Sequence, residues 1–240
     1  PSGTLIWLNA VGLGEVMALR GLIIALHNRD PELQFLVTSS TLISATTFAN
    51  NLPPNTLHQF LPLDCPAYTR QFLDHWHPDL ALWSEQDIWP SAVHETALRH
   101  IPQALINVRM SAASFRSKTF VRPLFRATYK SFSLISAQER VTAQSLQMLA
   151  GHDNIRIDGS LKPHCPPLFI DRDKRIEFTD ASMGRSIWLA ASCHPEDEDI
   201  ALAAQRLLLR QGGHPLLIIS PRYPNRANEI LAKLDGLNVK

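Results

Sequence analysis

The stretch TLIWLNAVGLGEVMALRGLIIALHN, residues 4–28, sets the architecture of this chain. It opens with an apolar run at residues 4–9, which is typical of a buried strand, and a glycine turn follows at residues 12–15. Residues 16–28 then place apolar side chains at helical spacing. Those side chains are Val16, Leu19, Leu22, Ile23 and Leu26. The stretch therefore predicts a strand, a turn and a helix in succession.

The same alternation continues outward from this stretch as far as residue 158. Short apolar runs predict strands at residues 33–39, 56–61, 80–83, 103–107, 134–137 and 155–158. Segments with helical character predict helices at residues 41–50, 66–76 and 89–99. Strands that alternate with helices form a parallel sheet covered on both faces. We therefore predict an α/β fold, with a Rossmann-like, doubly wound parallel sheet in residues 1–163.

A break in the pattern follows at residues 162–173, where Pro163, Pro166 and Pro167 suit an interdomain linker. The alternation then restarts, with strands predicted at residues 186–190 and 216–220 and helices at residues 196–211 and 225–234. Two such units do not complete a parallel layer, because its strands need neighbours and covered faces. We therefore expect residues 164–240 to form an incomplete second Rossmann-like domain, which indicates a fragment or a shortened gene product.

The composition places the chain among soluble globular proteins. Apolar residues make up 45% and charged residues 19% of its 240 residues, and the formal net charge is +1. A charge this small gives no overall electrostatic reason to expect a nucleic-acid partner. The three cysteines are widely spaced, which favours a reducing compartment. No apolar run approaches the ~20 residues that span a bilayer, and no signal-peptide pattern is present, so the chain reads as cytosolic.

Candidate binding residues follow the predicted strands of the first domain, where ligands of doubly wound sheets bind. Gly14 and Glu15 lie in the turn after the first strand, where backbone N–H groups are free and the chain can approach a ligand closely. Glu85 and Asp87 follow residues 80–83, and two carboxylates there suit the positioning of a sugar hydroxyl group. The alternatives are structural: Glu15 complements a helix dipole, and the later pair is a charged helix start.

Three further candidates lie at the domain junction and beyond it. Lys162 at an interdomain cleft suits an anionic ligand, although it also fits a solvated linker. Arg222 can grip a phosphate group, or can be a surface arginine of a helix start. His194 precedes a proline and four acidic residues, a helix-start signal that argues only modestly for ligand binding. A zinc site built from His194 and the neighbouring cysteines matches no recognised spacing.

A basic and aromatic region occupies residues 96–138, which contain no acidic residue. Its bases are Arg99, Arg109, Arg116, Lys118, Arg122, Arg126 and Lys130, and its aromatic residues are Phe115, Phe120, Phe125, Tyr129 and Phe132. This combination suits an anionic membrane surface or a phosphorylated lipid. It also suits single-stranded nucleic acid, or a solvated basic face above core aromatics. The sequence leaves these interpretations open.

The order of these segments along the chain resembles the family of Kdo transferases, which add 3-deoxy-D-manno-octulosonic acid (Kdo) to lipid A during lipopolysaccharide assembly. The matching segments are G-E at residues 14–15, E-Q-D-I-W-P-S at 85–91, N-V-R-M-S at 107–111, A-Q at 137–138, G-S-L-K at 159–162, C-H-P-E-D-E at 193–198 and P-R-Y-P-N-R at 221–226. Tyr223 stands where the family has histidine, and Asp87 where it has glutamate. The family's N-terminal membrane anchor and its distal nucleotide-contacting segments have no counterpart here.

The resemblance implies a GT-B architecture, in which the first domain binds the acceptor and the second binds most of the donor. It implies that Glu15 is the general base of an inverting transfer that needs neither metal nor cofactor. Its implied acceptor-binding residues are Gly14, Thr38, Ser39, Thr41, Glu85, Asp87 and Arg109, and its implied donor-binding residues are Lys162, His194 and Arg222.

The implied partners are CMP-Kdo, a lipid A precursor and, peripherally, the cytoplasmic face of the bacterial inner membrane. We expect little or no transfer by the 240-residue chain itself, because much of the family's donor pocket has no counterpart. Two alternatives stay open: another GT-B transferase with a different nucleotide sugar, and a non-catalytic chain that binds acidic glycolipid.

Overall fold

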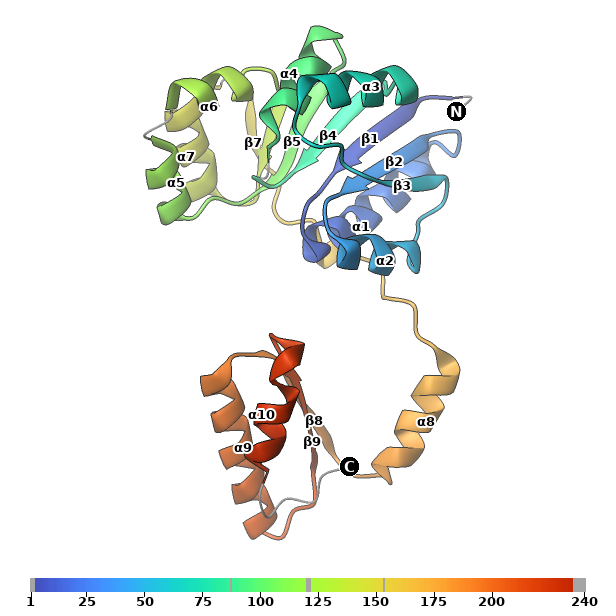
Figure 1. The fold of residues 1–240 in the computed structure, drawn as a ribbon, viewed down its shortest axis with the longest axis vertical. Helices are drawn as coiled ribbons and strands as arrows, with labels where there is room; N and C mark the ends of the chain where they lie inside the picture. The colour runs from blue at the N-terminus through green and yellow to red at the C-terminus, as the bar shows by residue number, and fades with distance from the viewer. Residues whose placement is uncertain (1–2, 87, 120–121, 153, 235–240) are drawn as a thin grey trace. The chain divides into compact units, whose positions relative to one another are not determined.

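The computed structural model describes residues 3–86, 88–119, 122–152 and 154–234. It divides the chain into two compact units, Pro1–Phe169 and Ile170–Lys240. Each unit has its own sheet (Figure 1). Asp87, one of the predicted acceptor-binding residues, lies outside the described residues.

The first unit is built on a parallel sheet of seven strands in the order β3-β2-β1-β4-β5-β6-β7. The strands are β1 (Leu5–Asn9), β2 (Gln34–Ser39), β3 (Thr56–Phe60), β4 (Leu80–Ser84), β5 (Gln103–Val108), β6 (Leu134–Ala137) and β7 (Ile155–Ile157). Each of them coincides, to within one residue at its end, with a segment that the sequence predicts as a strand. The doubly wound parallel sheet is therefore confirmed.

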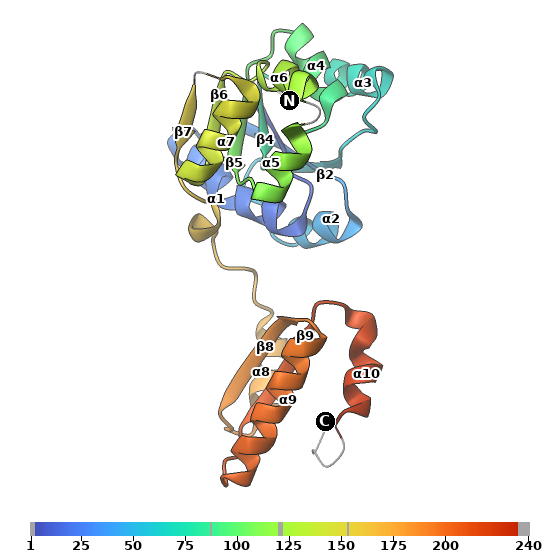
Figure 2. The same ribbon diagram turned by 90° about the vertical axis from the view of Figure 1, so that its left-hand side faces the viewer.

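Helices connect these strands and cover both faces of the sheet (Figures 1 and 2). They are α1 (Leu13–Arg29), α2 (Leu42–Ala49), α3 (Pro66–Trp76), α4 (Pro90–Leu98), α5 (Ala112–Thr119), α6 (Arg122–Tyr129) and α7 (Arg140–Ala150). On one face α1 and α2 pack against a core that includes Leu8 and Val37. On the other face α3, α4, α6 and α7 enclose a core around Trp7, Trp83 and Leu105. The near-continuous burial of β1 follows from this double cover.

Strands β1 and β4 are neighbours at the centre of the sheet, although they are not consecutive in the sequence. To one side the chain continues through β2 and β3, and to the other through β5, β6 and β7. This reversal is a topological switch point, and ligands of open α/β sheets bind beside the carboxyl ends of the strands at such a point. The turn after Asn9 and the turn after Ser84 are therefore the first places to look for a site.

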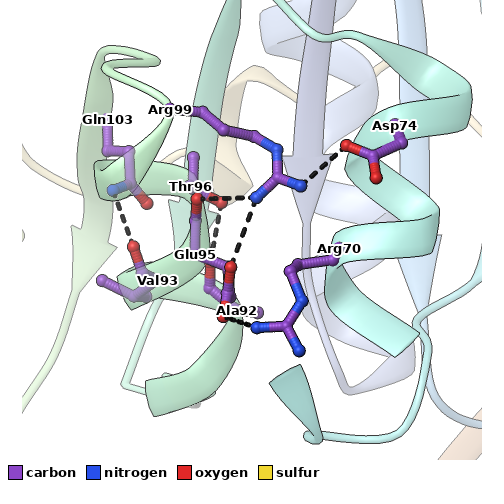
Figure 3. Close-up of polar contacts among 8 residues, drawn as sticks. All are labelled: Arg70, Asp74, Ala92, Val93, Glu95, Thr96, Arg99 and Gln103. Atoms are coloured by element: carbon purple, nitrogen blue, oxygen red, sulfur yellow. Dashed lines mark hydrogen bonds and ion pairs between the residues drawn. The ribbon is translucent and has the colours of Figure 1, made fainter. Parts of the chain in front are cut away.

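Helices α3 and α4 are joined by a polar network around a buried carboxylate (Figure 3). Glu95 is 4% exposed and accepts from Arg70 at 2.9 Å and from Arg99 at 3.3 Å. Arg99 also reaches Asp74 at 2.7 Å, and its hydrogen bond to that carboxylate raises the pKa of the guanidinium group. Gln103 at the start of β5 donates to the carbonyl oxygen of Val93. The network fixes α4, which begins just after the β4 turn.

The segment after β7 is hydrogen-bonded to the first unit as far as Phe169. A short 3₁₀ helix, η1 (Lys162–His164), contacts α1, and the guanidinium group of Arg20 donates to the carbonyl oxygens of Pro166 and Pro167 at 3.3 Å. Asn51 accepts from the Phe169 N–H group at 3.0 Å. The first part of the linker predicted over residues 162–173 is therefore bonded to the first unit, and the structural division falls after Phe169.

We expect Gly21→Ala to destabilise the first unit by about 2 kcal/mol, because the helix and η1 meet backbone to backbone at this position. A β-carbon on Gly21 would lie 2.2 Å from the carbonyl oxygen of His164. Chemical denaturation measures the change. Gly14→Ala is the matched control, because a β-carbon there meets no atom within 4 Å and alanine favours the helix. Equal losses of stability in the two variants would contradict the close contact.

The second unit pairs two parallel strands, β8 (Ile187–Cys193) and β9 (Leu216–Pro221), and α9 (Pro195–Arg210) packs on them (Figure 2). The 3₁₀ helix η2 (Pro224–Arg226) and α10 (Ala227–Ala232) follow β9. The strands and α9 match the sequence predictions. Helix α8 (Arg172–Ser182) does not, because it begins inside the predicted linker, where Asp171 caps its first N–H groups.

Candidate functional site

The turn after β1 brings Gly14 and Glu15 to the switch point. Gly12 is the N-cap of α1, and the Glu15 carboxylate turns back to accept from the Gly12 N–H group. This bond supports the structural interpretation of Glu15, because it satisfies a free N–H group at the start of α1. The side chain is nevertheless half-buried rather than enclosed, and Gly14 beside it is exposed. The carboxylate is therefore held at the first turn of α1, at the ligand edge of the sheet.

The three hydroxyl residues predicted after β2 have different surroundings. Thr38 is fully buried, where it accepts from Trp7 Nε1 at 2.9 Å and donates to Asn9 Oδ1 at 2.8 Å. Ser39 is also buried and bonds His58 Nε2 at 2.9 Å, and burial lowers the pKa of that imidazole. Both side chains therefore support the edge from within.

Thr41 lies at the surface, where it caps α2 by accepting from the Ser44 N–H group at 3.1 Å. The Ser44 hydroxyl group donates to the carbonyl oxygen of Val11 at 3.4 Å and so ties the α2 start to the β1 turn. Of the three predicted hydroxyl residues, Thr41 is the one whose side chain the structure exposes. The α1 and α2 starts therefore form one continuous edge.

A second group of side chains gathers at the carboxyl ends of β4, β5, β6 and β7. Glu85 follows β4, and its Oε1 accepts from Asn107 Nδ2 at 3.4 Å. Asn107 Oδ1 accepts from the Leu161 N–H group at 3.0 Å, and the Asn107 carbonyl oxygen accepts from Gln138 Nε2 at 2.8 Å. The structure thus joins Glu85 to the segment that carries Lys162, whose own side chain is exposed.

Arg109 stands at the same edge through its backbone. Gln86 donates to the Arg109 carbonyl oxygen, and its own Oε1 accepts from Ser114 at 2.8 Å and Lys118 at 2.6 Å. These bonds fasten the start of α5 to the β4 turn. The Arg109 side chain is exposed, so it can meet an anion at this edge.

The sequence predicts no role for Asn107 or Gln138, although both lie in segments that resemble the family. Their signal was position alone, since both lie where a strand ends. Asn9 was also missed. It ends β1 at 2% exposure, and its Nδ2 has no hydrogen-bond partner among the described residues.

Helices α5 and α6 carry most of the described basic and aromatic residues of the region predicted at residues 96–138. Tyr129 and Phe132 are buried and Phe115 and Phe125 pack against the same core, so the described aromatic residues are structural. Arg99 and Lys118 are half-buried and hold the bonds described above, and the other bases face outward. Those with exposed side chains are Arg109, Arg116, Arg122, Arg126 and Lys130. Phe120 lies outside the described residues. The region is a solvated basic face above core aromatics, a surface that remains open to an anionic partner.

Tyr129→Phe is expected to leave the stability unchanged or to raise it by up to about 1 kcal/mol. The Tyr129 hydroxyl group is buried, finds no hydrogen-bond partner in the described parts of the chain, and has its pKa raised by burial. Removing it therefore relieves a desolvated donor without opening a cavity. Denaturant unfolding measures the change, with the exposed Tyr68→Phe as the control. A clear loss of stability in Tyr129→Phe alone would reveal a bond to that hydroxyl group.

In the second unit the structure brings His194 and Arg222 together. Strands β8 and β9 end side by side, where the Arg222 N–H group donates to the Cys193 carbonyl oxygen at 2.8 Å. The His194 ring meets the Tyr223 ring edge-on, with centroids 6.0 Å apart. Both predicted donor-binding side chains are exposed at the carboxyl ends of their strands.

The acidic start of α9 is less repulsive to an anion than its sequence predicts. Glu198 is fully buried and binds Arg226 through both carboxylate oxygens, at 3.3 and 2.9 Å. Two of the four acidic charges are thus paired, because Asp199 also binds Lys233 at 2.6 Å. Arg226 is accordingly a structural residue of the η2 turn, which leaves Arg222 as the exposed arginine there.

The described residues hold no group of three or more histidine, cysteine, aspartate or glutamate side chains placed to bind a metal ion. None of the helices described is both long and apolar enough to cross a membrane.

Fold and edge geometry together define the class: an α/β protein of the GT-B type, with Rossmann-like units. A putative UDP-N-acetylglucosamine 2-epimerase from Listeria monocytogenes matches with a TM-score of 0.64 at 12% identity, covering 99% of this chain and 68% of that one. A glycosyltransferase from Rickettsia africae matches with a TM-score of 0.57 at 11% identity, covering 98% and 65%. These likenesses show the fold alone.

The family follows from sequence. Residues 1–165 match the family described as 3-deoxy-D-manno-octulosonic-acid transferase (kdotransferase), and the chain belongs to this family. Relatives with that transferase name include one from Rickettsia felis, 34% identical over 98% of this chain and 50% of its own length, and one from Haemophilus influenzae, 28% identical over 94% and 53%. A probable mitochondrial one from Arabidopsis thaliana is 32% identical over 100% and 55%. The chain thus spans about half the length of these relatives.

Proposed function

We propose that this chain forms the acceptor-binding unit and part of the donor-binding unit of an enzyme that transfers Kdo from CMP-Kdo to a lipid A precursor. The observation that carries the proposal is the Glu15 carboxylate, held at the switch-point edge in a member of the Kdo transferase family. Glu85 and Thr41 flank that edge as candidate acceptor contacts, with Gly14 giving open backbone beside them.

Transfer of Kdo from CMP-Kdo needs one general base and several cationic groups. An acceptor hydroxyl group attacks the anomeric carbon of Kdo, Glu15 takes the hydroxyl proton, and the bond to CMP breaks with inversion. CMP departs as a phosphate monoester, whose negative charge is stabilised by cations and N–H donors. Lys162, His194 and Arg222 are the exposed groups that we assign to this task.

The basic face of α5 and α6 fits this role, because a lipid A precursor carries phosphate groups and lies in a membrane. We propose that the face attaches the protein peripherally to the cytoplasmic surface of the bacterial inner membrane. Exposed arginine and lysine side chains bind such anionic surfaces by an additive, salt-sensitive attraction.

The test is a transfer assay with labelled CMP-Kdo and a lipid A precursor, followed by competition with CMP and with UDP. Kdo transfer that CMP inhibits and UDP does not supports the proposal. Inhibition by UDP in place of CMP would point to another nucleotide sugar, and would overturn the donor assignment.

The exposed basic face also favours a second candidate, a non-catalytic chain that binds acidic glycolipid through its first unit. This candidate predicts lipid A binding that weakens with salt and survives Glu15→Gln, without any transfer. Binding and transfer measured on the same preparation separate the two.

A further inference from the structure

Asn107 is the residue before the last in β5, and its backbone conformation is unusual. Its φ of 56° lies in the left-handed region, where asparagine is among the few side chains tolerated, and it is 2% exposed. The register between β5 and β6 shifts between Leu105 and Val108. An irregularity of this kind re-aims a side chain at the end of a strand.

The re-aimed residue meets three other strand-end segments. Its Nδ2 donates to Glu85 after β4, its Oδ1 accepts from the Leu161 N–H group after β7, and its carbonyl oxygen accepts from Gln138 after β6. One buried residue thus bonds all the neighbouring turns on this side of the switch point. Strained backbone held by several bonds is a pattern found at functional sites.

We propose that Asn107 is a positioning residue, which holds the Glu85 carboxylate and the segment carrying Lys162 in place at the ligand edge. The inference rests on the proposed function for what binds there. The amide is suited to this task because it offers a donor to a carboxylate and an acceptor to an N–H group at once.

Two substitutions separate these bonds without demanding a new backbone conformation. Asn107→Asp keeps an acceptor for Leu161, loses the donor to Glu85 and tolerates the left-handed conformation. Asn107→Gly keeps that conformation at no steric cost and loses both side-chain bonds. Asn107→Asp also adds a negative charge beside Glu85, so the Leu161 bond is reported by amide exchange at Leu161 and not by the kinetics alone.

The experiment combines amide hydrogen exchange at Leu161 with transfer kinetics for each substrate. We expect exchange at Leu161 to become roughly tenfold faster in Asn107→Gly and to stay near wild type in Asn107→Asp. We expect the KM for the acceptor to rise roughly tenfold in both variants, and the KM for CMP-Kdo to rise only in Asn107→Gly. A merely structural residue would change neither KM selectively.

Unchanged Leu161 exchange in Asn107→Gly would overturn the proposal, as would wild-type KM values for both substrates in a chain that transfers Kdo. A wild-type chain that transfers no Kdo would agree with our expectation for a chain that spans about half the length of its relatives. The exchange measurement still decides the bond network, because it needs no turnover.

Discussion

In a protein that joins this chain to the remaining part of the family's donor-binding domain, replacing Glu15 with glutamine is expected to lower the rate of Kdo transfer by about 10²–10⁴-fold, the range that a positioned general base contributes. The substitution removes the proton acceptor but leaves a side-chain oxygen that can still accept from the Gly12 N–H group. The N-terminus of α1 therefore stays capped. The rate is measured with labelled CMP-Kdo, and unfolding by denaturant shows that the first unit keeps its stability.

Gly12→Ala is the matched variant, because it moves the carboxylate without removing it. A β-carbon on Gly12 would lie 2.6 Å from Glu15 Oε2, while the Gly12 φ of −80° suits alanine. The flexible Glu15 side chain has to give way, so we expect the transfer rate to fall in this variant too. Full transfer by Glu15→Gln would reduce Glu15 to a helix cap and remove it from the reaction.

The sheet of the first unit is predictable because its strands are short, apolar and separated by segments of helical spacing. The buried apolar runs at residues 5–8 of β1 and 35–37 of β2 make this signal strong. Helix α8 has no such signal. Its residues are charged or polar for the most part and nearly all exposed, so no apolar period marks them.

The site is predictable to the level of the strand ends, because parallel strands share one carboxyl edge. That rule finds Glu15 and Glu85 without any coordinates, whereas Lys162 is predicted from its place at the domain junction. It does not distinguish Thr41, which is exposed, from Thr38, which is buried and bonded to Asn9. It also misses Asn107, whose role depends on a left-handed turn and on partners far away in the sequence.

A triple substitution of Arg116, Arg122 and Lys130 to glutamine is expected to weaken binding to anionic vesicles by about 100-fold. Each base near an anionic membrane contributes about 1 kcal/mol, so three together give about that factor. All three side chains are exposed. Arg122 and Arg126 lie on one side of α6 at four-residue spacing, and Lys130 directly follows the last residue of that helix. Co-sedimentation with mixed phosphatidylglycerol and phosphatidylcholine vesicles measures the change.

The matched control removes the same charge elsewhere, by substituting Arg172, Lys174 and Arg175 on α8 with glutamine. These side chains are exposed too, so a loss that follows net charge alone would be equal in both proteins. We expect the α8 variant to bind almost as the wild type does, and binding of both to fall as salt shortens the range of the attraction. Equal losses would assign the attraction to overall charge. Preferential binding of a single-stranded oligonucleotide would assign the basic face to nucleic acid. The aromatic residues of this region lie in the core and are not free to stack on bases, so a nucleic acid and a lipid would both be bound through their phosphate groups.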